Sequence, residues 1–310
     1  MDERRLWAIV LAGGEGTRLA EATRRMYGSC LPKQFLSFGQ SRTFLQMTID
    51  RLRGLVPPKR IVVVVAARHI DVARQQLADL EGVQIVSQPR NVGTGPGVLL
   101  PLCHVLARDP NADVALVPSD HDFRAPAKML QALVTARRAV RGGAEMVLIG
   151  ARAEWAASDL GWIVPKRLRR RSPVSSIEAF VEKPEPRVAA GLLERGALWN
   201  TMLCVAQAGA LWQLARRHLP TQVALFEEYA RSIGTDVAET CLGDVYDRLP
   251  AADFSRDLVA ASEGLRVTAM DGAGWSDCGT PERLAAAFTG LSEALGAADA
   301  RRAGAEAVPL

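Results

Sequence analysis

Long hydrophobic runs are missing from this sequence of 310 residues. No apolar stretch approaches the roughly 20 residues that a helix needs to cross a bilayer. The first five residues, MDERR, are charged and lead into a short apolar stretch, which is not the pattern of a secretory signal peptide. We therefore expect a cytoplasmic protein without membrane contact.

Paired cysteines are missing as well. The five cysteines are odd in number, form no CxxC pair and are scattered over positions 30, 103, 204, 241 and 278. This spacing argues against a disulfide framework and against a zinc ribbon. We expect each thiol to be a small side chain in the core or near the surface.

A large excess of one sign of charge is missing too. The 38 Lys and Arg residues nearly balance the 34 Asp and Glu residues, and the net charge of +4 is too weak to imply a nucleic-acid partner. The basic cluster KRLRRR at 166–171 is expected to be a solvated hairpin loop rather than a patch for polyanions, and its role stays open.

The first half of the chain alternates apolar runs with helical patterns. The apolar runs are rich in Val and Ile and predict buried strands at 7–11, 61–66, 83–87, 114–118 and 146–150. Helical patterns between them cover 43–53, 70–80, 97–108 and 127–141. This alternation predicts an α/β fold with a mostly parallel, Rossmann-like sheet flanked by helices. Ligands of such sheets bind at the carboxyl ends of the strands.

The pattern changes after residue 150. Short strands are expected at 161–165, 176–182, 198–206 and 265–270, and helices at 210–219 and 222–233. A last helix is expected to open at Thr280, a capping residue type, with Pro281 in its first turn. The Ala-rich residues 291–310 are expected to form a tail that frays.

Three glycines, Gly13, Gly14 and Gly16, follow the first expected strand. The segment is not a Walker A loop, and it misses the dinucleotide fingerprint because Leu19 stands where Gly or Ala is wanted. Arg18 falls in the first turn of the next helix, where the helix dipole disfavours a cation unless it meets an anion. A glycine turn without a ligand is the alternative, but the pattern favours phosphate binding.

Two aspartates lie where a phosphate-bound metal ion would need them. Asp120 follows the expected strand 114–118, so its carboxylate should face the ligand crevice. Asp277 lies in a glycine-rich turn and is a candidate second ligand for Mg²⁺, which takes one or two carboxylates plus phosphate oxygens. Each aspartate alone fits a cap or turn residue equally well.

Other polar groups stand near strand ends. Lys33, within PKQF, is able to bring a second positive charge to the same phosphates, or it is an exposed lysine at a strand start. Glu182, Lys183 and Asn200 supply a carboxylate, an ammonium and an amide, the set that a sugar phosphate requires. A surface ion pair and a satisfied amide are the alternative.

Taken together and in order, these segments resemble the sugar-1-phosphate nucleotidyltransferases, and within them the mannose-1-phosphate guanylyltransferases. The matching segments are LAGGEGTR at 11–18, PKQF at 32–35, NVGT at 91–94, PSDH at 118–121, FVEKP at 180–184, WN at 199–200 and WSDCG at 275–279. They cover nearly the whole chain. The PKQF segment favours the guanylyl branch over the thymidylyl and uridylyl branches.

The resemblance implies a nucleotide-diphospho-sugar transferase fold and a reaction. GTP and mannose 1-phosphate would give GDP-mannose and pyrophosphate by in-line attack at the α-phosphorus, assisted by Mg²⁺ and without a covalent enzyme intermediate. A single nucleotidyltransferase domain would cover 1–290, with a nucleotide-binding part at about 1–150 and a sugar-phosphate part at about 151–290. The oligomeric state stays open, a homodimer being one option.

The resemblance also implies roles for individual residues. The catalytic cations would be Arg18 and Lys33. The nucleotide would contact Leu11, Ala12, Gly13, Gly14, Gly16, Thr17, Asn91, Thr94 and Pro96. The sugar phosphate would contact Gly161, Glu182, Lys183 and Asn200. The metal ligands would be Asp120 and Asp277.

Three segments depart from the family pattern. LGWI at 160–163 replaces a Gly-Tyr-Gly-Tyr-Ile stretch, TML at 201–203 follows the Trp-Asn pair, and ADFSRD at 252–257 replaces Ser-Ile-Asp-Tyr. The role of Asp257 in the last of these stays open. A nicotinamide-dependent oxidoreductase and a non-catalytic nucleotide-binding protein remain as alternative hypotheses.

Overall fold

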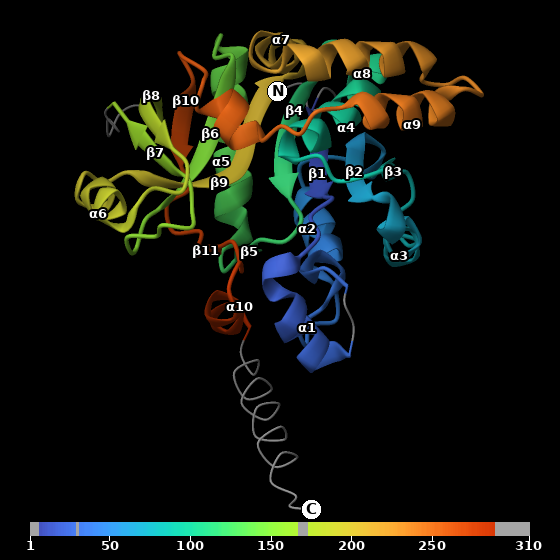
Figure 1. Cartoon of the computed structure of the whole chain (residues 1–310). Helices are drawn as coiled ribbons and strands as arrows, with labels where there is room; N and C mark the ends of the chain where they lie inside the picture. The colour runs from blue at the N-terminus through green and yellow to red at the C-terminus, as the bar shows by residue number, and fades with distance from the viewer. Residues whose placement is uncertain (1–5, 29–30, 167–172, 289–310) are drawn as a thin grey trace, which may run out of the picture.

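A nine-stranded sheet forms the centre of the protein (Figure 1). The computed structural model describes residues 6–28, 31–166 and 173–288, except for the side chains of Arg18 and four residues of α1. The strands follow the spatial order β3-β2-β1-β4-β9-β6-β10-β8-β7. Their bounds are β1 Leu6–Ala12, β2 Ile61–Ala66, β3 Gln84–Gln88, β4 Asp113–Pro118, β6 Met146–Arg152, β7 Trp162–Pro165, β8 Val174–Val181, β9 Leu198–Gln207 and β10 Arg266–Ala269. A second, two-stranded sheet pairs β5 (Asp122–Phe123) with β11 (Trp275–Ser276).

The large sheet is mixed, whereas the sequence predicts a mostly parallel one. Strands β3, β2, β1 and β4 are parallel, and β10 runs parallel to β6. Strand β9 lies antiparallel between β4 and β6, and β7 and β8 form an antiparallel pair. The prediction holds where strands alternate with helices along the chain. It fails after β6, where β7 and β8 are successive strands without an intervening helix, which suits antiparallel pairing.

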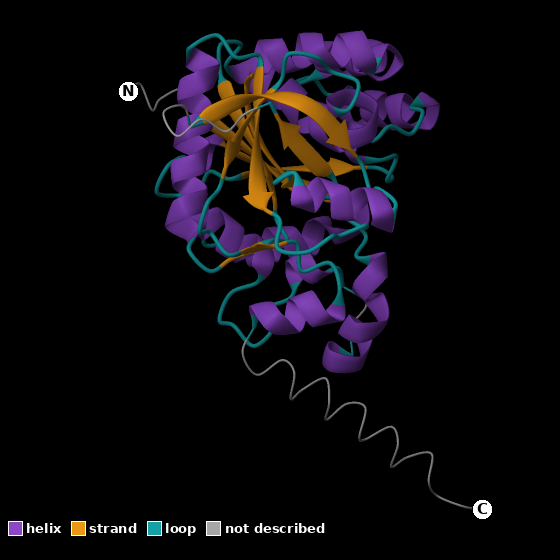
Figure 2. Cartoon of the chain, turned by 90° about the vertical axis from the view of Figure 1, so that its left-hand side faces the viewer, coloured by secondary structure: helices purple, strands orange, loops and turns teal. Residues whose placement is uncertain are grey.

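Helices cover both faces of this sheet (Figure 2). Their bounds are α1 Ala20–Tyr27, α2 Phe44–Leu52, α3 Ile70–Gln76, α4 Thr94–Arg108, α5 Pro126–Arg141, α6 Pro186–Glu194, α7 Ala208–His218, α8 Pro220–Ser232, α9 Ala238–Arg248 and α10 Pro281–Ala287. The helices α6 and α9 and the π-helix Phe254–Val259 are not among those expected from the sequence. The sequence also predicts that α4 begins at Gly97, but it begins at Thr94, because proline at position 96 is tolerated in a first helical turn.

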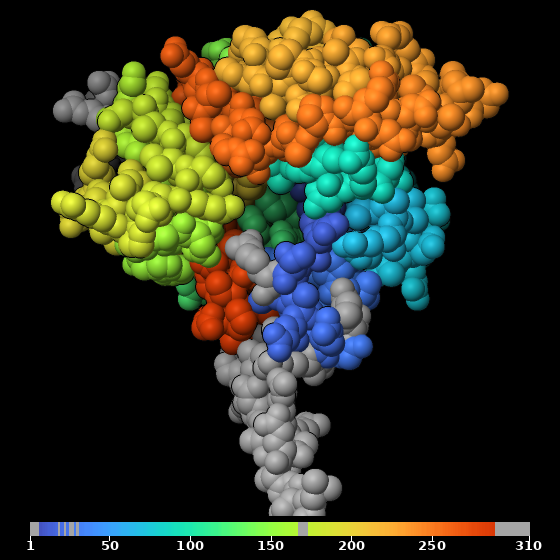
Figure 3. Space-filling model, in the orientation of Figure 1, coloured from blue at the N-terminus to red at the C-terminus, as the bar shows by residue number. Residues whose placement is uncertain are grey.

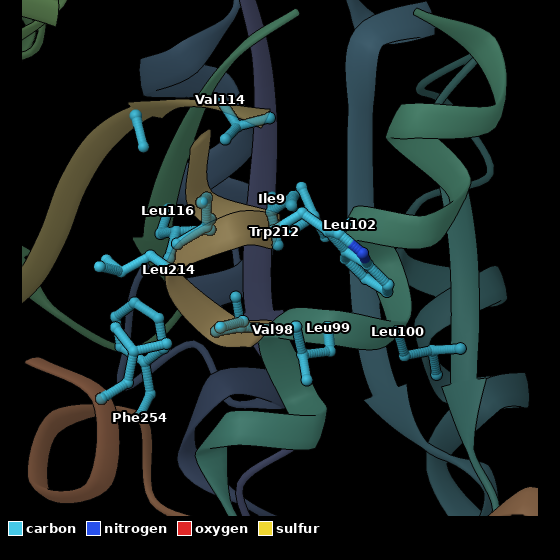
Figure 4. Close-up of a cluster of buried hydrophobic side chains, with 14 of the residues drawn as sticks. Ile9, Val98, Leu99, Leu100, Leu102, Val114, Leu116, Trp212, Leu214 and Phe254 are labelled. Carbon is cyan, nitrogen blue, oxygen red and sulfur yellow. The ribbon is translucent and has the colours of Figure 1, made fainter. Parts of the chain in front are cut away.

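The apolar core is divided between the two faces of the sheet. On β1, Ile9 packs with residues of α4, α7 and α8, whereas Ala8 and Val10 pack with residues of α2 and α5. Figure 4 shows part of the first face, with Ile9 between the sheet and helix residues such as Leu102 and Trp212. A strand that is buried on both faces produces a continuous apolar run, which is why β1 is recognisable in the sequence.

The expectations about cysteines, membrane helices, the basic cluster and the C-terminal tail remain to be compared with the structure. Four cysteines lie in the described part, none of them paired, and burial raises the pKa of Cys204 and of Cys278 to about 12. Within the same part, no helix has both the length and the apolar character required to cross a membrane. Cys30, the basic residues 167–171 and the tail at 291–310 lie outside the described residues.

Candidate active site

A cleft of about 410 Å³ opens at the carboxyl ends of β1, β3 and β4. The ends of β1 and β4 are adjacent, since Leu11 pairs with Pro118 and the Ser119 N–H donates to the Leu11 carbonyl at 3.1 Å. Figure 3 shows the surface hollowed between the blue N-terminal segment, the teal segment of α4 and the orange segment near residue 250. The lining residues are Leu11, Gly13, Gly14, Gln34, Val64, Gln88, Asn91, Gly93, Thr94, Gly97, Pro118, Ser119, Asp120, His121, Met202 and Asp253.

The glycine loop after β1 is held from both sides. Gln34 Nε2 donates to the carbonyl oxygens of Ala12 at 3.0 Å and Gly14 at 2.7 Å. A Cβ on Gly13 would lie 2.4 Å from Gln88 Nε2, and a Cβ on Gly16, whose φ is +66°, would lie 2.9 Å from Pro32 Cα. The loop therefore needs glycine at position 16, for its backbone conformation and the close approach of Pro32, whereas at position 13 a larger residue would displace the Gln88 amide.

The loop between β3 and α4 is braced by the segment before the π-helix. The Gly95 N–H donates to the Ala252 carbonyl at 2.9 Å. Thr94 Oγ1 donates to Asp253 Oδ2 at 3.1 Å and accepts from the Phe254 N–H at 2.8 Å. Asp257 has a supporting role here, because its Oδ2 accepts from the Asp253 N–H at 2.7 Å. The hydrogen bond to Arg256 lowers the pKa of Asp257, so it stays ionised.

Five of the nine residues expected at the nucleotide line this cleft, namely Leu11, Gly13, Gly14, Asn91 and Thr94. The other four, which do not line it, are Ala12, Gly16, Thr17 and Pro96. Arg18 belongs to the 3₁₀ helix Thr17–Leu19, and its side chain lies outside the described part of the structure. Gln88, Met202 and Asp253 line the cleft although the sequence did not indicate them. Only Gln88 had a signal in the sequence, a polar residue at the end of an apolar strand.

Oxygen atoms gather around the ammonium group of Lys33. Lys33 Nζ lies 3.1 Å from Asp120 Oδ2 and donates to the carbonyl oxygens of Asp277 at 2.5 Å and Cys278 at 3.2 Å. Burial raises the pKa of Asp120, but Lys33 and His121 together lower it by more, so the pKa lies below its usual value. Asp120 is therefore a carboxylate at neutral pH, 31% exposed and facing the cleft.

His121 supports Asp120 as a neutral side chain. The Trp275 indole, which only donates, gives its hydrogen bond to His121 Nδ1 at 3.1 Å. The ring proton must then lie on Nε2, which is 3.8 Å from Asp120 Oδ1. Burial lowers the pKa of His121 to about 4, so the imidazole is uncharged at neutral pH.

The residues around Lys33 fit a magnesium ion. Around Lys33, Asp120 supplies a carboxylate and Asp277 its main-chain carbonyl oxygen, both hard ligands of the kind that Mg²⁺ prefers. The Asp277 carboxylate does not line the cleft; its Oδ1 lies 3.0 Å from Arg283 Nε. No group of three or more His, Cys, Asp or Glu side chains with metal-binding geometry occurs in the described ranges. Two carboxylates are nevertheless sufficient for Mg²⁺ where phosphate and water complete its coordination.

The residues expected at the sugar converge beside this cleft but do not line it. The Asn200 N–H donates to the Gly161 carbonyl at 2.7 Å, and a Cβ on Gly161 would lie 2.6 Å from Glu182 Oε2. Lys183, which is largely exposed, places its Nζ 3.6 Å from Glu182 Oε1. Burial raises the pKa of Glu182, and Lys183 offsets this only in part. We call Gly161, Glu182 and Asn200 the sugar corner.

Met202 connects the sugar corner with the cleft. Its N–H donates to Asn200 Oδ1 at 3.1 Å, and its side chain lines the cleft. Its φ is +59°, and the other described non-glycine residues with positive φ are Phe38, Lys183 and Cys278. Three of these four are in or next to the candidate site, where backbone strain is most often stored.

Comparison with known proteins shows the family of this chain. The model of the Nucleotidyl transferase family matches residues 7–294. Mannose-1-phosphate guanylyltransferase 2 from Escherichia coli O157:H7 is 27% identical over 296 residues, which cover 92% of this chain and 60% of that protein. Alginate biosynthesis protein AlgA from Pseudomonas aeruginosa is also 27% identical, over 88% of this chain and 56% of that protein. The chain thus spans less than two thirds of the length of either relative.

A solved structure gives the same result. The crystal structure of a mannose-1-phosphate geranyltransferase from Thermus thermophilus superposes with a TM-score of 0.78 at 27% identity, over 92% of this chain and 79% of that one. The family model covers nearly every residue from β1 to α10, including the glycine loop, Asp120 and the sugar corner. The chain therefore belongs to the Nucleotidyl transferase family.

Proposed function

We propose that this protein transfers the nucleotidyl group of GTP to mannose 1-phosphate and forms GDP-mannose and pyrophosphate. The observation that carries the proposal is the junction of three features: the glycine loop, the Asp120–Lys33 pair and the sugar corner. Relatives at 27% identity named as mannose-1-phosphate guanylyltransferases support the choice of substrates.

The reaction joins two anions, so the protein must position them and compensate their charge. A phosphate oxygen of the hexose 1-phosphate forms a bond to the α-phosphorus of GTP, while the bond to the pyrophosphate oxygen breaks. The N–H groups of the glycine loop and the side chains of Arg18 and Lys33 would hold the phosphates. Mg²⁺ held by Asp120 and Asp277 would supply further positive charge to the triphosphate.

The orientation of the Gln88 amide supports a base that carries a carbonyl group. The Tyr246 hydroxyl donates to Gln88 Oε1 at 3.2 Å, so the amide oxygen is already occupied. Gln88 Nε2 lies on the side of Gly13 and lines the cleft as a donor. Guanine has a carbonyl oxygen to accept from this group, whereas adenine has none. Adenine accepts only through its ring nitrogens, so we expect GTP to be preferred to ATP.

A substrate matrix tests the proposed function. GTP, ATP, UTP, CTP and dTTP are each combined with mannose, glucose and fucose 1-phosphates and Mg²⁺, and pyrophosphate release is measured. GTP with mannose 1-phosphate should give the highest kcat/KM. Preference for another pair would replace the substrates within the same reaction class, and no turnover with any pair would refute the enzymatic role.

Replacing Glu182 by Gln should impair the use of mannose 1-phosphate and spare GTP. The carboxylate of the sugar corner accepts hydrogen bonds from sugar hydroxyls, and loss of a charged acceptor costs about 1.5–3 kcal/mol, or roughly 10- to 100-fold in KM. Because burial raises the pKa of Glu182, part of it is protonated in mild acid. The wild-type KM for mannose 1-phosphate should accordingly fall as the pH rises through that pKa.

The Gln variant also serves as the control for this pH dependence. Ionisation of the substrate phosphate affects both proteins equally, so the difference between the two KM profiles isolates Glu182. An increase confined to the KM for GTP would contradict the placement of Glu182 at the sugar.

A further inference from the structure

Arg283, in the first turn of α10, lies between two carboxylates from distant parts of the chain. Its Nε is 3.0 Å from Asp277 Oδ1. Its Nη1 donates to Asp159 Oδ1 at 3.2 Å, and Nη2 donates to Asp159 Oδ2. The guanidinium thus makes a bidentate contact with Asp159 and an ion pair with Asp277. The side chains of Arg283 and Asp277 are only 13% and 9% exposed.

The Asp277 end of this contact is tightly built. Asp277 Oδ1 also accepts from the Gly279 N–H at 3.1 Å. A Cβ on Gly279 would lie 2.4 Å from Asp277 Oδ2 and 3.1 Å from Arg283 Nη2, so a larger residue there would displace both side chains. Thr280 caps the helix by accepting from the Arg283 N–H at 3.3 Å, which fixes the backbone that carries the guanidinium. The turn therefore orients the Asp277 carboxylate through the Gly279 N–H, and Arg283 adds an ion pair whose Nε lacks hydrogen-bond geometry.

The Asp159 end leads to the sugar corner. Asp159 is two residues before Gly161, whose carbonyl accepts from the Asn200 N–H. The same short segment is anchored at Ala157, whose carbonyl accepts from Trp162 Nε1 at 2.7 Å. A residue that holds Asp159 therefore also holds the strand start on which the sugar corner is built.

We propose that Arg283 is a positioning residue that fixes Asp277, a proposed metal ligand, relative to the sugar corner. This role rests on the proposed function. Arg283 does not line the cleft and touches no reacting atom. It acts through its partners: the guanidinium contacts Asp277 on one side and Asp159 on the other, and so fixes the position of the proposed metal ligand relative to the sugar corner. Outer-shell partners of this kind typically change metal affinity or activity by 10- to 100-fold when they are lost.

Three variants and one matched control separate the two ends of the contact. Arg283→Met removes both ends, and Arg283→Lys keeps the charge but loses the planar fork. Asp159→Asn weakens only the contact on the sugar side. Arg152→Met is the control, because it breaks another Arg–Asp ion pair, Arg152 Nε to Asp271 Oδ1 at 2.7 Å, in which both side chains are exposed.

Two measurements report on the variants. Electron paramagnetic resonance titration gives the affinity for Mn²⁺ in the presence of GTP, and initial rates give KM for mannose 1-phosphate. Arg283→Met should weaken Mn²⁺ binding by roughly 10- to 100-fold and raise that KM, with Arg283→Lys restoring little. Asp159→Asn should raise KM and leave Mn²⁺ affinity unchanged. Arg152→Met should change neither.

The outcomes distinguish this role from the proposed function. If the wild type is active and Arg283→Met binds Mn²⁺ as tightly as the wild type or more tightly, the positioning role alone is overturned. The same holds if Arg283→Met loses thermal stability while its Mn²⁺ affinity and its KM for mannose 1-phosphate are unchanged. Lack of turnover in the substrate matrix would overturn the proposed function, while the Mn²⁺ titration still decides whether Arg283 orients a metal ligand. A wild type that binds no Mn²⁺ with any triphosphate would overturn both.

Discussion

Replacing Asp120 by Asn should lower kcat by about 100-fold or more, the scale of losing one key electrostatic group. The substitution keeps the shape of the side chain and removes its charge. It also weakens the contact that holds the Lys33 ammonium at 3.1 Å from Asp120 Oδ2. Both the proposed metal ligand and the placement of Lys33 are then compromised. Pyrophosphate release at saturating GTP, mannose 1-phosphate and Mg²⁺ measures the effect.

Asp122 provides the control for the Asp120 variant. It lies two residues further on, and its Oδ1 contacts Arg51 Nη2 at 3.3 Å instead of facing the cleft. Asp122→Asn should therefore retain a kcat close to that of the wild type. Near-normal turnover in Asp120→Asn would show that this carboxylate is remote from the reacting phosphates, and the proposed site would have to be revised.

Replacing Gly93 by Ala should destabilise the protein and weaken nucleotide binding together. Gly93 has φ +99° and ψ 174°, a region that is essentially restricted to glycine and costs about 1–3 kcal/mol for other residues. A Cβ there would also lie 2.2 Å from the Ala252 carbonyl oxygen, and overpacking of this kind costs roughly another 1–3 kcal/mol. Moving Ala252 away would disturb the contact between Thr94 and Asp253 that shapes the cleft. Urea unfolding and KM for GTP measure the two consequences.

Gly143→Ala separates the backbone effect from the clash. Gly143 has φ +95°, but a Cβ on it would meet no atom within 4 Å. Its substitution should therefore cost only the backbone strain and leave KM for GTP unchanged. If both variants lose the same stability and Gly93→Ala keeps its KM, the segment around Ala252 does not brace the nucleotide loop.

The sequence predicted best where the evidence is local. The strands of the first half are buried on both faces, so each one reads as an apolar run that ends at a polar or glycine-rich loop. The glycine loop and Asp120 were singled out for this reason. Lys33 was singled out within the PKQF segment, and it contacts Asp120 in the structure. Thr280 was likewise recognised as a helix cap from residue type alone, and its side chain accepts from the Arg283 N–H.

Contacts between distant segments had no counterpart in the sequence pattern. The Gln88 side chain, at the end of β3, reaches Gly13 and accepts from the Tyr246 hydroxyl of α9, and Asp253 contacts Thr94 across 159 positions. The sequence left the role of Asp257 open; the structure places Asp253 in the cleft, and Asp257 accepts a hydrogen bond from the Asp253 N–H. The sequence shows two carboxylates four positions apart, but it does not show which of them faces the cleft when a π-helix follows the first.

By itself, the sequence determined the elements of the first half, the glycine loop and the acidic residue that follows β4, because burial and backbone conformation restrict residue type locally. Only the tertiary structure decided that β9 runs antiparallel between β4 and β6, that Met202 joins the sugar corner to the cleft, and that Arg283 connects Asp277 to Asp159. These features depend on which strand pairs with which and in what register. Such pairing is set by the packing of whole faces against each other, which no short stretch of sequence encodes.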